Sequence, residues 1–449
     1  MPNNLKIALI GAGSAQFSAE IVRDLCVNPG LQDTHVALMD IDERRLEMVR
    51  RLAERLSSEL NAGLSFSTTT NRTESLEGAD FVINTAQVGG HAWVEAQRSL
   101  AEAHGYYRGL SLHNYGQALF FMEVARDMER TCPEAWLIQS ANPVFEGCTL
   151  MARETRIKVL GLCHGHYGYL DVTRVLGLQA EQVTAQTVGF NHWIWLTDFR
   201  YRGQDAYPLL DEWIRNRAEA YWAETDGKRS FYDNQMSRAA IHQYQLYGLL
   251  PIGDTPRMIG WWYHTDLETK VRWFGHMGGF DSEIGWQQYL DLMSANVIKV
   301  EGAALDESRP ITDTFKAEQG GEQIVPIIDA LVNDRPGIYQ VNIPNRGQIV
   351  RGFPEDLVVE CQGMVSGAGI RGVGEAELPP RVMAGAMIPR WQQAEMMVEA
   401  LRHGDRKLLL LDLLSDPRTR SLEQAEGLLE AWLADPRNER LRCHFGVQS

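Results

Sequence analysis

The start of the chain constrains the fold more than any other segment. Leu5 to Ile10 is an apolar run broken only by Lys6, as expected of a strand buried on both faces of a parallel sheet. This strand runs directly into the loop Gly11-Ala12-Gly13-Ser14-Ala15-Gln16-Phe17, and residues 18–27 are predicted to form a helix. A strand, a glycine loop and a helix in this order indicate the first unit of a doubly wound α/β sheet.

The first third of the chain repeats this alternation, and the rest departs from it. Further strands are predicted at 36–39, 81–83, 136–138 and 159–162, and an amphipathic helix at 43–60. Beyond them, antiparallel strands are predicted at 183–188 and 194–199, a strand near 357–360, and helices at 391–401 and 422–433.

These patterns predict an α/β fold with two domains. Residues 1–190 are expected to form a Rossmann-like, doubly wound NAD-binding domain. Residues 191–449 are expected to form an α+β domain that binds substrate and mediates oligomerisation. The whole is expected to be similar to lactate and malate dehydrogenases.

Composition narrows the class of partner. The formal net charge of −16 argues against nucleic acid, because phosphate binding needs a cationic surface. Six scattered cysteines form no CxxC pair, so neither a disulfide frame nor a zinc finger is indicated. No apolar run approaches the roughly 18 residues of a membrane helix, and the N-terminus shows no leader pattern. We therefore expect a cytoplasmic protein that binds a small molecule and neither nucleic acid nor a membrane.

The glycine loop predicts a dinucleotide site. Gly11 permits the tight turn, and Gly13 lets the backbone approach a pyrophosphate. Ala12, Ser14 and Phe17 complete the loop at the helix N-terminus, where free N–H groups and the helix dipole favour phosphate.

Two further positions specify the cofactor. Gln16 stands where the usual third glycine would be, so the loop alone is a weak signal. Asp40 ends the second strand, where a carboxylate can accept a hydrogen bond from the ribose 2′-hydroxyl and would repel a 2′-phosphate. This favours NAD over NADP. Asn84, after the strand at 81–83, is expected beside the cofactor at the same sheet edge.

Three short motifs carry the chemistry: Gln139-Ser140-Ala141-Asn142-Pro143-Val144-Phe145, Gly161-Leu162-Cys163-His164-Gly165-His166-Tyr167-Gly168 and Gly189-Phe190-Asn191-His192-Trp193. The Cys163 thiolate and the His192 imidazole suit a divalent transition ion, although a single Cys or His is more often a core residue. Two protein ligands leave positions open for a sugar's hydroxyls, and the ion would stabilise an enolate. Asn142 is expected to hold a sugar hydroxyl.

Together these motifs resemble glycoside hydrolase family 4. That family has a GxGS-type loop on the first strand, an N-P segment, a C-H or C-N segment and a G-x-N-H segment, and all four occur here in the family's order. The resemblance continues through 250–255, 345–347 and 353–360, and so covers essentially the whole chain.

The resemblance implies an NAD- and Mn2+-dependent α-glycosidase, in which Cys163 and His192 bind the metal. In the family, NAD+ takes a hydride from C3 of the sugar, a base removes the acidified C2 proton, and the aglycone leaves by elimination. Water then adds and NADH returns the hydride, while Mn2+ stabilises the enolate. NAD-dependent glycosidases are exceptions to the two-carboxylate mechanism.

The resemblance and the chemistry of the residues suggest which side chains act as acid and base. His164 is the candidate acid for the leaving oxygen, because an imidazole titrates near neutral pH. Asp254, in a loop, is the candidate base at C2, with a role as a turn cap the plainer alternative. Other family members use a tyrosine as base, so Tyr247 and Tyr263 remain alternatives. Asn191 is expected to contact substrate.

The residues after the cysteine indicate the sugar. The C-H-G pattern resembles the α-glucuronidase-like subgroup and differs from the C-N pattern of members that act on 6-phosphosugars. A uronate needs a cation for its carboxylate, and Arg257 and Arg108 are the candidates. Sugar faces could stack on indole rings. The candidate stacking residues are Trp193, Trp195, Trp261 and Trp262.

The preferred hypothesis is therefore an α-glycosidase that acts on α-glucuronides, with the resemblance also implying a homodimer or homotetramer. Within the family, an α-glucosidase, an α-galactosidase or an α-galacturonidase remains open. An NAD-dependent 2-hydroxyacid dehydrogenase, which would show net NADH formation, is the alternative of another class. A non-catalytic NAD-binding sensor, which would leave glycosides intact, is the third.

Overall fold

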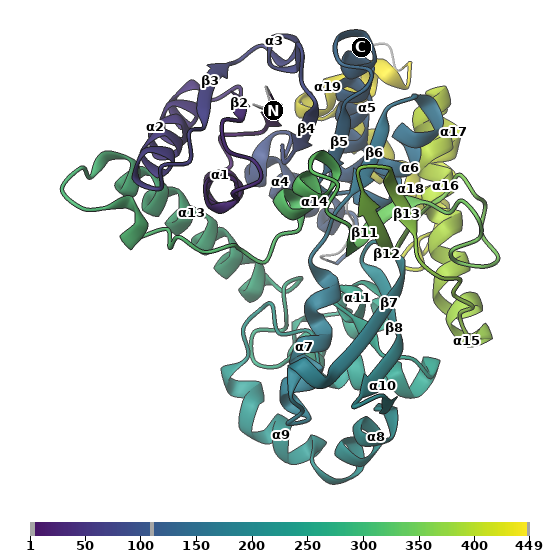
Figure 1. Ribbon diagram of the computed structural model, residues 1–449. Coiled ribbons are helices and arrows are strands. Elements are labelled where there is room, and N and C mark those ends of the chain that lie inside the picture. Colours follow the sequence, from purple (N-terminus) through teal and green to yellow (C-terminus); the bar gives the residue numbers. More distant parts are fainter. Residues whose placement is uncertain (1–4, 108–111, 447–449) are drawn as a thin grey trace.

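A computed structural model describes residues 5–107 and 112–446. One mixed 13-stranded sheet runs through the molecule, with helices on its faces (Figure 1). Its main path is ordered β10-β8-β7-β12-β11-β6-β5-β4-β1-β2-β3, while β13 pairs with β12 and β9 with β8. The strands are β1 (Lys6–Ile10), β2 (His35–Met39), β3 (Ser65–Thr69), β4 (Phe81–Asn84), β5 (Trp136–Gln139), β6 (Lys158–Gly161), β7 (Val183–Phe190), β8 (Trp193–Tyr201), β9 (Gln204–Asp205), β10 (Pro251–Ile252), β11 (Gly337–Pro344), β12 (Val358–Ser366) and β13 (Gly369–Gly372).

The half from β3 to β6 is parallel, as the sequence predicts for a doubly wound sheet. Its register aligns the last residues of four neighbouring strands: Ile10 pairs with Asn84, Asn84 with Gln139, and Gln139 with Gly161. The loops that follow these strands therefore leave from one edge of the sheet, which is where ligands bind in such folds.

The other half is antiparallel. β11 joins this half to β6, and β7 and β8 form the predicted antiparallel pair across the turn at Asn191 and His192. The sheet is continuous through β7 and β8, which lie on either side of residue 190. The division into domains of residues 1–190 and 191–449 therefore stays a prediction.

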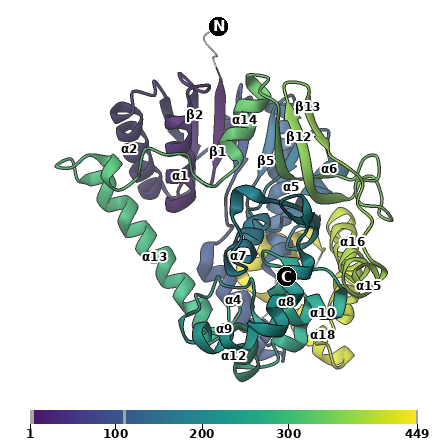
Figure 2. The same cartoon turned by 60° about the horizontal axis from the view of Figure 1, so that its bottom comes forward.

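Helices cover both halves, and one long helix connects them. They are α1 (Ala15–Val27), α2 (Glu43–Glu59), α3 (Arg72–Leu76), α4 (Gly90–Ala103), α5 (His113–Thr131), α6 (Val144–Glu154), α7 (Gly168–Val175), α8 (Tyr207–Asn216), α9 (Ala218–Thr225), α10 (Arg238–Tyr247), α11 (Thr255–Met258), α12 (Leu267–Phe274), α13 (Glu283–Leu305), α14 (Ile324–Val332), α15 (Pro380–Val382), α16 (Ile388–His403), α17 (Arg406–Ser415), α18 (Leu422–Ala434) and α19 (Glu439–His444). α13 runs from beside α12 to α2 (Figure 2).

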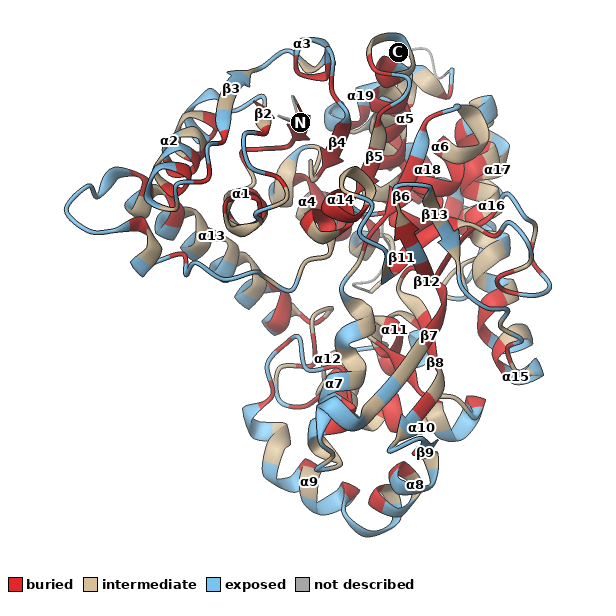
Figure 3. Cartoon of the chain, viewed as in Figure 1, coloured by how far each residue is buried: buried red, intermediate tan, exposed pale blue. Residues whose placement is uncertain are grey.

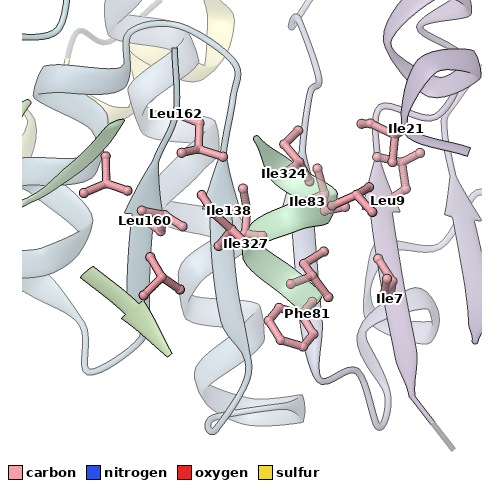
Figure 4. Close-up of a cluster of buried hydrophobic side chains, with 14 of the residues drawn as sticks. Ile7, Leu9, Ile21, Phe81, Ile83, Ile138, Leu160, Leu162, Ile324 and Ile327 are labelled. Atoms are coloured by element: carbon pink, nitrogen blue, oxygen red, sulfur yellow. The ribbon is translucent and has the colours of Figure 1, made fainter. Parts of the chain in front are cut away.

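The core forms where the parallel strands meet their helices. Apolar side chains of β1, β4, β5 and β6 pack against α1 and α14 (Figure 4), and the central strands are almost completely buried (Figure 3). Fully burying one such Leu or Ile side chain contributes roughly 1.5–3 kcal/mol. This packing fixes the strand ends from which the site is built. Among the described residues, no helix is both long and apolar enough to span a bilayer.

Candidate active site

The glycine loop is shaped by close backbone contacts. Gly11 has a φ of +85°, and a Cβ there would lie 2.6 Å from the backbone of Ala86. The N–H of Gly13 donates to Oδ2 of Asp40 at 2.8 Å, and the N–H of Asp42 donates to Oδ1 of Asp40 at 2.9 Å. The second strand thus delivers a carboxylate directly against the loop, as the sequence predicts.

The loop fits a dinucleotide. A Cβ at Gly11 would collide with the backbone of Ala86, and a Cβ at Gly13 would lie 2.8 Å from the Asp40 carboxyl group, so only glycine lets the loop approach both. Ser14 precedes α1 and makes no capping bond with its own side chain, and Ser14 and Phe17 are half-buried at the loop. The N-terminal N–H groups of α1 and the Asp40 carboxylate are the groups that a pyrophosphate and a ribose require.

Asn84 lies at the carboxyl end of β4, at the sheet edge where the sequence predicts it. Its side chain is completely buried, donating to Oε1 of Gln139 at 3.0 Å and accepting from the N–H of Ala86 at 3.2 Å. Both ends of the amide are thus bonded within the protein. Asn84 thus holds Ala86 against Gly11 at the carboxyl end of β4, and its contact with a cofactor stays a prediction.

The metal motifs converge from strands far apart in sequence. Cys163 follows β6, and His192, with a φ of +62°, lies in the turn between β7 and β8. Asn191 connects them: its amide hydrogen-bonds the Cys163 thiol and donates to Oε2 of Glu360 at 3.1 Å. Glu360 lies on β12, is completely buried and also influences the thiol electrostatically. The pairing of β12 with β7 therefore places the two motifs at one site.

Asp254 enters this site from a third segment. Its Oδ2 lies 3.4 Å from Nε2 of His192. The preceding Gly253 has a φ of +65°, and a Cβ there would lie 2.7 Å from the Cα of Gly165. The loop after β10 thus lies in contact with the Cys163 segment, and only glycine fits at this contact.

The charges of these groups suit a divalent ion. Burial raises the pKa of the Cys163 thiol, and Glu360 and Asp254 raise it further, so the thiol needs a nearby cation to ionise. Burial lowers the pKa of His192, which keeps the imidazole neutral and able to donate a lone pair. In residues 5–107 and 112–446, no group of three or more His, Cys, Asp and Glu is placed to hold a metal, and the roles of Cys163 and His192 as metal ligands stay a prediction.

His164 extends toward solvent beside the thiol. Its side chain is 66% exposed, and its Nδ1 lies 3.3 Å from Oε1 of Glu322. This bond raises the pKa of His164, because the carboxylate stabilises the imidazolium. The second nitrogen, Nε2, therefore remains available to a substrate, as an acid near neutral pH requires.

Arg257 has partners that the sequence did not predict. Its Nε donates to Oδ1 of Asp254 at 2.9 Å, and its Nη1 donates to Oδ2 of Asp281 at 2.9 Å. Burial alone would raise the pKa of Asp254, but the Arg257 guanidinium holds it well below its usual range. The guanidinium thus bonds two protein carboxylates through Nε and Nη1, and its contact with a substrate carboxylate stays a prediction. The other candidate, Arg108, lies outside the described residues.

The two alternative tyrosine bases are hydrogen-bonded within the protein. Tyr263 is completely buried, with its hydroxyl 2.7 Å from Nδ1 of His242, and burial raises its pKa to about 12. Tyr247 is buried against Trp195, with its hydroxyl on the carbonyl of Gly385 at 3.4 Å. Tyr232, which the sequence analysis missed, is 51% exposed. Burial and the nearby Asp254 carboxylate raise the pKa of its phenol. Nothing in the sequence around Tyr232 distinguishes it from the chain's other tyrosines.

The remaining residues that are predicted to contact substrate differ in how exposed their side chains are. Asn142 is exposed beside its cis peptide bond to Pro143, so its amide is open to a ligand. Trp195 is completely buried and therefore belongs to the core. Trp193 is half-buried, with the Arg390 guanidinium 4.8 Å from its ring centroid. The exposed indoles of Trp261 and Trp262 lie on the short helix η4 (Trp261–Tyr263).

A hollow of about 840 Å3 lies between α9, α10 and α12. Its walls include Trp222, Arg238, His242 and Trp273, and none of the predicted site residues. The Arg238 guanidinium lies 4.5 Å from the Trp222 ring centroid, so it covers that indole face.

The parallel half-sheet and its glycine loop define a dehydrogenase-like α/β protein. Two family models match the chain: family 4 glycosyl hydrolase over residues 6–178, and its C-terminal domain over residues 187–419. The chain therefore belongs to glycosyl hydrolase family 4, as its motifs predict, and is a glycoside hydrolase.

Characterised relatives span nearly the whole chain. An α-galacturonidase from Thermoanaerobacter italicus is 24% identical over 444 residues, which cover 94% of each chain. An α-galactosidase from Rhizobium meliloti is 24% identical and covers 92% of this chain and 84% of its own.

Solved structures confirm the predicted fold class. A putative glucosidase from Bacillus subtilis has a TM-score of 0.80 at 22% identity, covering 95% of this chain and 99% of its own. A 6-phospho-α-glucosidase from gut microorganisms, solved with NAD and Mn2+, has a TM-score of 0.77 at 17% identity, covering 96% and 98%. A lactate dehydrogenase from Cryptosporidium parvum has a TM-score of 0.51 at 14% identity, covering 89% and 99%.

Proposed function

We propose that the protein is an NAD- and Mn2+-dependent α-glycosidase whose preferred substrate is an α-glucuronide. The observation that carries this proposal is the convergence of Cys163, His192 and Asp254 from three separate loops. A hydroxyacid dehydrogenase would not need Cys163 as a metal ligand. The related 6-phospho-α-glucosidase with NAD and Mn2+ supports the same pair of cofactors.

The residues present fit both cofactors. The loop Gly11-Ala12-Gly13-Ser14 and Phe17 would hold the dinucleotide, with Asp40 on its ribose, and Cys163 and His192 would hold the metal. When bound, NAD+ supplies a hydride acceptor for the sugar C3 and Mn2+ supplies positive charge beside the sugar oxygens.

The chain's own side chains then move the protons. Asp254, held ionised by Arg257, accepts the proton from C2 of the sugar. His164, oriented through its Nδ1 by Glu322, donates a proton to the leaving glycosidic oxygen. Asn142 donates a hydrogen bond to a sugar hydroxyl, and Asn191, which is buried, supports the thiol that it hydrogen-bonds.

The preference for a uronate rests on the Cys163-His164-Gly165-His166 pattern. The α-galacturonidase from Thermoanaerobacter italicus, which spans 94% of this chain, makes an α-galacturonide the second candidate substrate. Neutral α-glucosides and α-galactosides are the further candidates. Because Arg257 is paired with two carboxylates, the position of the uronate-binding cation stays open. The cytoplasmic location and the homodimeric or homotetrameric state stay predictions.

A substrate panel tests the proposal. Purified protein with NAD+, Mn2+ and a thiol reductant is incubated in D2O with p-nitrophenyl α-glucuronide, α-galacturonide, α-glucoside and α-galactoside. We expect release of p-nitrophenol from a uronide, deuterium at C2 of the product, and no net NADH. Product without C2 deuterium would refute the mechanism. Net NADH from a 2-hydroxyacid would favour the dehydrogenase, and NAD+ binding without turnover would favour a sensor.

A further inference from the structure

Arg257 lies between two carboxylates that come from different segments. One guanidinium nitrogen holds Asp254 of the loop after β10, and another holds Asp281 of the loop before α13, each at 2.9 Å. The Phe280 ring centroid lies 4.7 Å from the same guanidinium and restricts its tilt. Arg257 therefore fixes the position of Asp254 on the condition that Asp281 keeps its position.

Asp281 is itself fixed by other elements. Nη1 of Arg98, on α4, lies 3.7 Å from its Oδ1, and Nζ of Lys270, on α12, donates to its backbone carbonyl. Ser282, the next residue, caps α13 by accepting from the N–H of Gly285 at 2.8 Å. Three helices thus determine where this carboxylate lies.

α13 extends this arrangement to the dinucleotide loop. Toward its other end, Asn296 donates to Gln16 in the glycine loop, and Glu301 pairs with Arg44 of α2 at 3.0 Å. Nη1 of Arg55 donates to the carbonyl of Ala303 at 2.6 Å. The helix that begins beside Asp281 therefore ends against α1 and α2, which follow the glycine loop and Asp40 in the chain (Figure 2).

We propose that Asp281 is a positioning residue for the base Asp254. Asp281 anchors Arg257 from the side opposite Asp254, and this keeps the Asp254 carboxylate beside His192 and facing the substrate. The proposal rests on the proposed function, in which Asp254 accepts the C2 proton. The proposal also extends that function, because α13 connects the segment that positions the base with the segment of the dinucleotide loop.

Arg257 changes its pairing when one of its two carboxylate partners loses its charge. In Asp281→Asn the side-chain volume is kept, but the guanidinium is left with Asp254 as its only full negative charge. A bidentate pair with Asp254 then becomes the favoured geometry, and it would draw that carboxylate away from His192. Misplacing a reacting group by about 1 Å can reduce turnover by on the order of 100-fold.

The first experiment compares turnover in three variants. For D281N we expect kcat to fall by about 10- to 100-fold, with KM and the Kd for NAD+ within about threefold of wild type. D281E keeps the charge and should recover part of kcat. Asp329→Asn is the matched control, since Asp329 is a buried aspartate paired with Arg335 at 2.9 Å on α14, away from Asp254. D329N should lose stability but keep kcat.

The second readout reports the step that is affected. With substrate deuterated at C2, the isotope effect on kcat should be larger in D281N than in wild type, because proton removal becomes slower relative to other steps. A merely structural loss of active enzyme would leave the isotope effect unchanged. Equal kcat in D281N and D329N, or an unchanged isotope effect alongside a lower kcat, would overturn the proposal.

The third readout does not depend on activity. In a crystal structure of D281N, or of D281E if D281N does not fold, we expect Asp254 to have left its position 3.4 Å from Nε2 of His192. An Asp254 and Arg257 in their original places would overturn the positioning role whatever the kinetics show. A wild-type protein inactive on every glycoside would instead refute the proposed function, and the crystal structure would still decide the role of Asp281.

Discussion

Asp40→Asn is the sharpest test of the cofactor site, because the structure fixes what the change removes. The two carboxylate oxygens of Asp40 each accept one backbone N–H, from Gly13 at 2.8 Å and from Asp42 at 2.9 Å. Their remaining lone pairs are the ones available to ribose hydroxyls. Asparagine has one oxygen, so it can keep one backbone bond, and its NH2 group must then face the other N–H donor.

The cost in affinity follows from these contacts. The variant loses at least one charge-assisted hydrogen bond to the ribose, a loss of about 1.5–3 kcal/mol. Since about 1.4 kcal/mol is tenfold in affinity, the Kd for NAD+ should rise by about 10- to 150-fold. The preference for NAD+ over NADP+ should also fall, because the carboxylate no longer repels a 2′-phosphate.

Calorimetric titration of metal-free protein at fixed ionic strength measures the Kd for NAD+ and the Kd for NADP+. Asp42→Asn is the matched control: it is the same chemical change two residues away, at the N-cap of α2, where asparagine caps as well as aspartate. Its affinity for NAD+ should stay within about twofold of wild type. Undiminished NAD+ binding in D40N, or an equal loss in D42N, would show that Asp40 does not bind the ribose.

Three further predictions concern the metal, the loop contact and the base. Cys163→Ser should abolish Mn2+-dependent turnover while NAD+ titrates with unchanged affinity; full turnover would remove Cys163 from the site. Gly253→Ala, whose Cβ would lie 2.7 Å from Gly165, should lower kcat at least tenfold, whereas Gly248→Ala, with a similar φ of +79° and open space around it, should lower only the melting temperature; equal kcat in both would refute the contact. Asp254→Asn should lower kcat by about 100- to 10,000-fold, while Tyr263→Phe should cost about 1 kcal/mol of unfolding free energy and leave kcat nearly unchanged; the reverse pattern would make the tyrosine the base.

The parallel half of the sheet was predictable because burial on both faces leaves a plain signal. β1, β2 and β4 are nearly continuous apolar runs, and each was predicted within a residue or two. β3 gives no such signal, since Ser65-Phe66-Ser67-Thr68-Thr69 is an edge strand that, within the described part of the chain, pairs with β2 alone and keeps mostly exposed or half-exposed residues. α13 also escaped prediction: large apolar side chains such as Ile298 and Leu305 face solvent, which removes the helical apolar stripe.

The site divides in the same way. Cys163, His192 and Asp254 could be chosen from motifs, because each motif is local in sequence. The residues that support these three could not be chosen from the sequence. Glu360 reaches the site only because β12 pairs with β7, and Asp281 reaches Arg257 from the loop before α13. Arg257 shows the consequence, since a sequence reader sees a free cation near a binding loop, whereas the fold gives it two carboxylate partners.

A shared sheet explains how a dehydrogenase-like fold can host a hydrolase. The parallel half brings the glycine loop and Cys163 to one edge, because the ends of β1, β4, β5 and β6 are in register. The antiparallel half brings His192 and Asp254 to the same place through β7, β8 and β10. A mechanism that removes a hydride and later returns it requires base, metal and nicotinamide to keep their relative positions through the whole cycle. One continuous sheet carries all of these segments, and α13 packs outside it against α1 and α2.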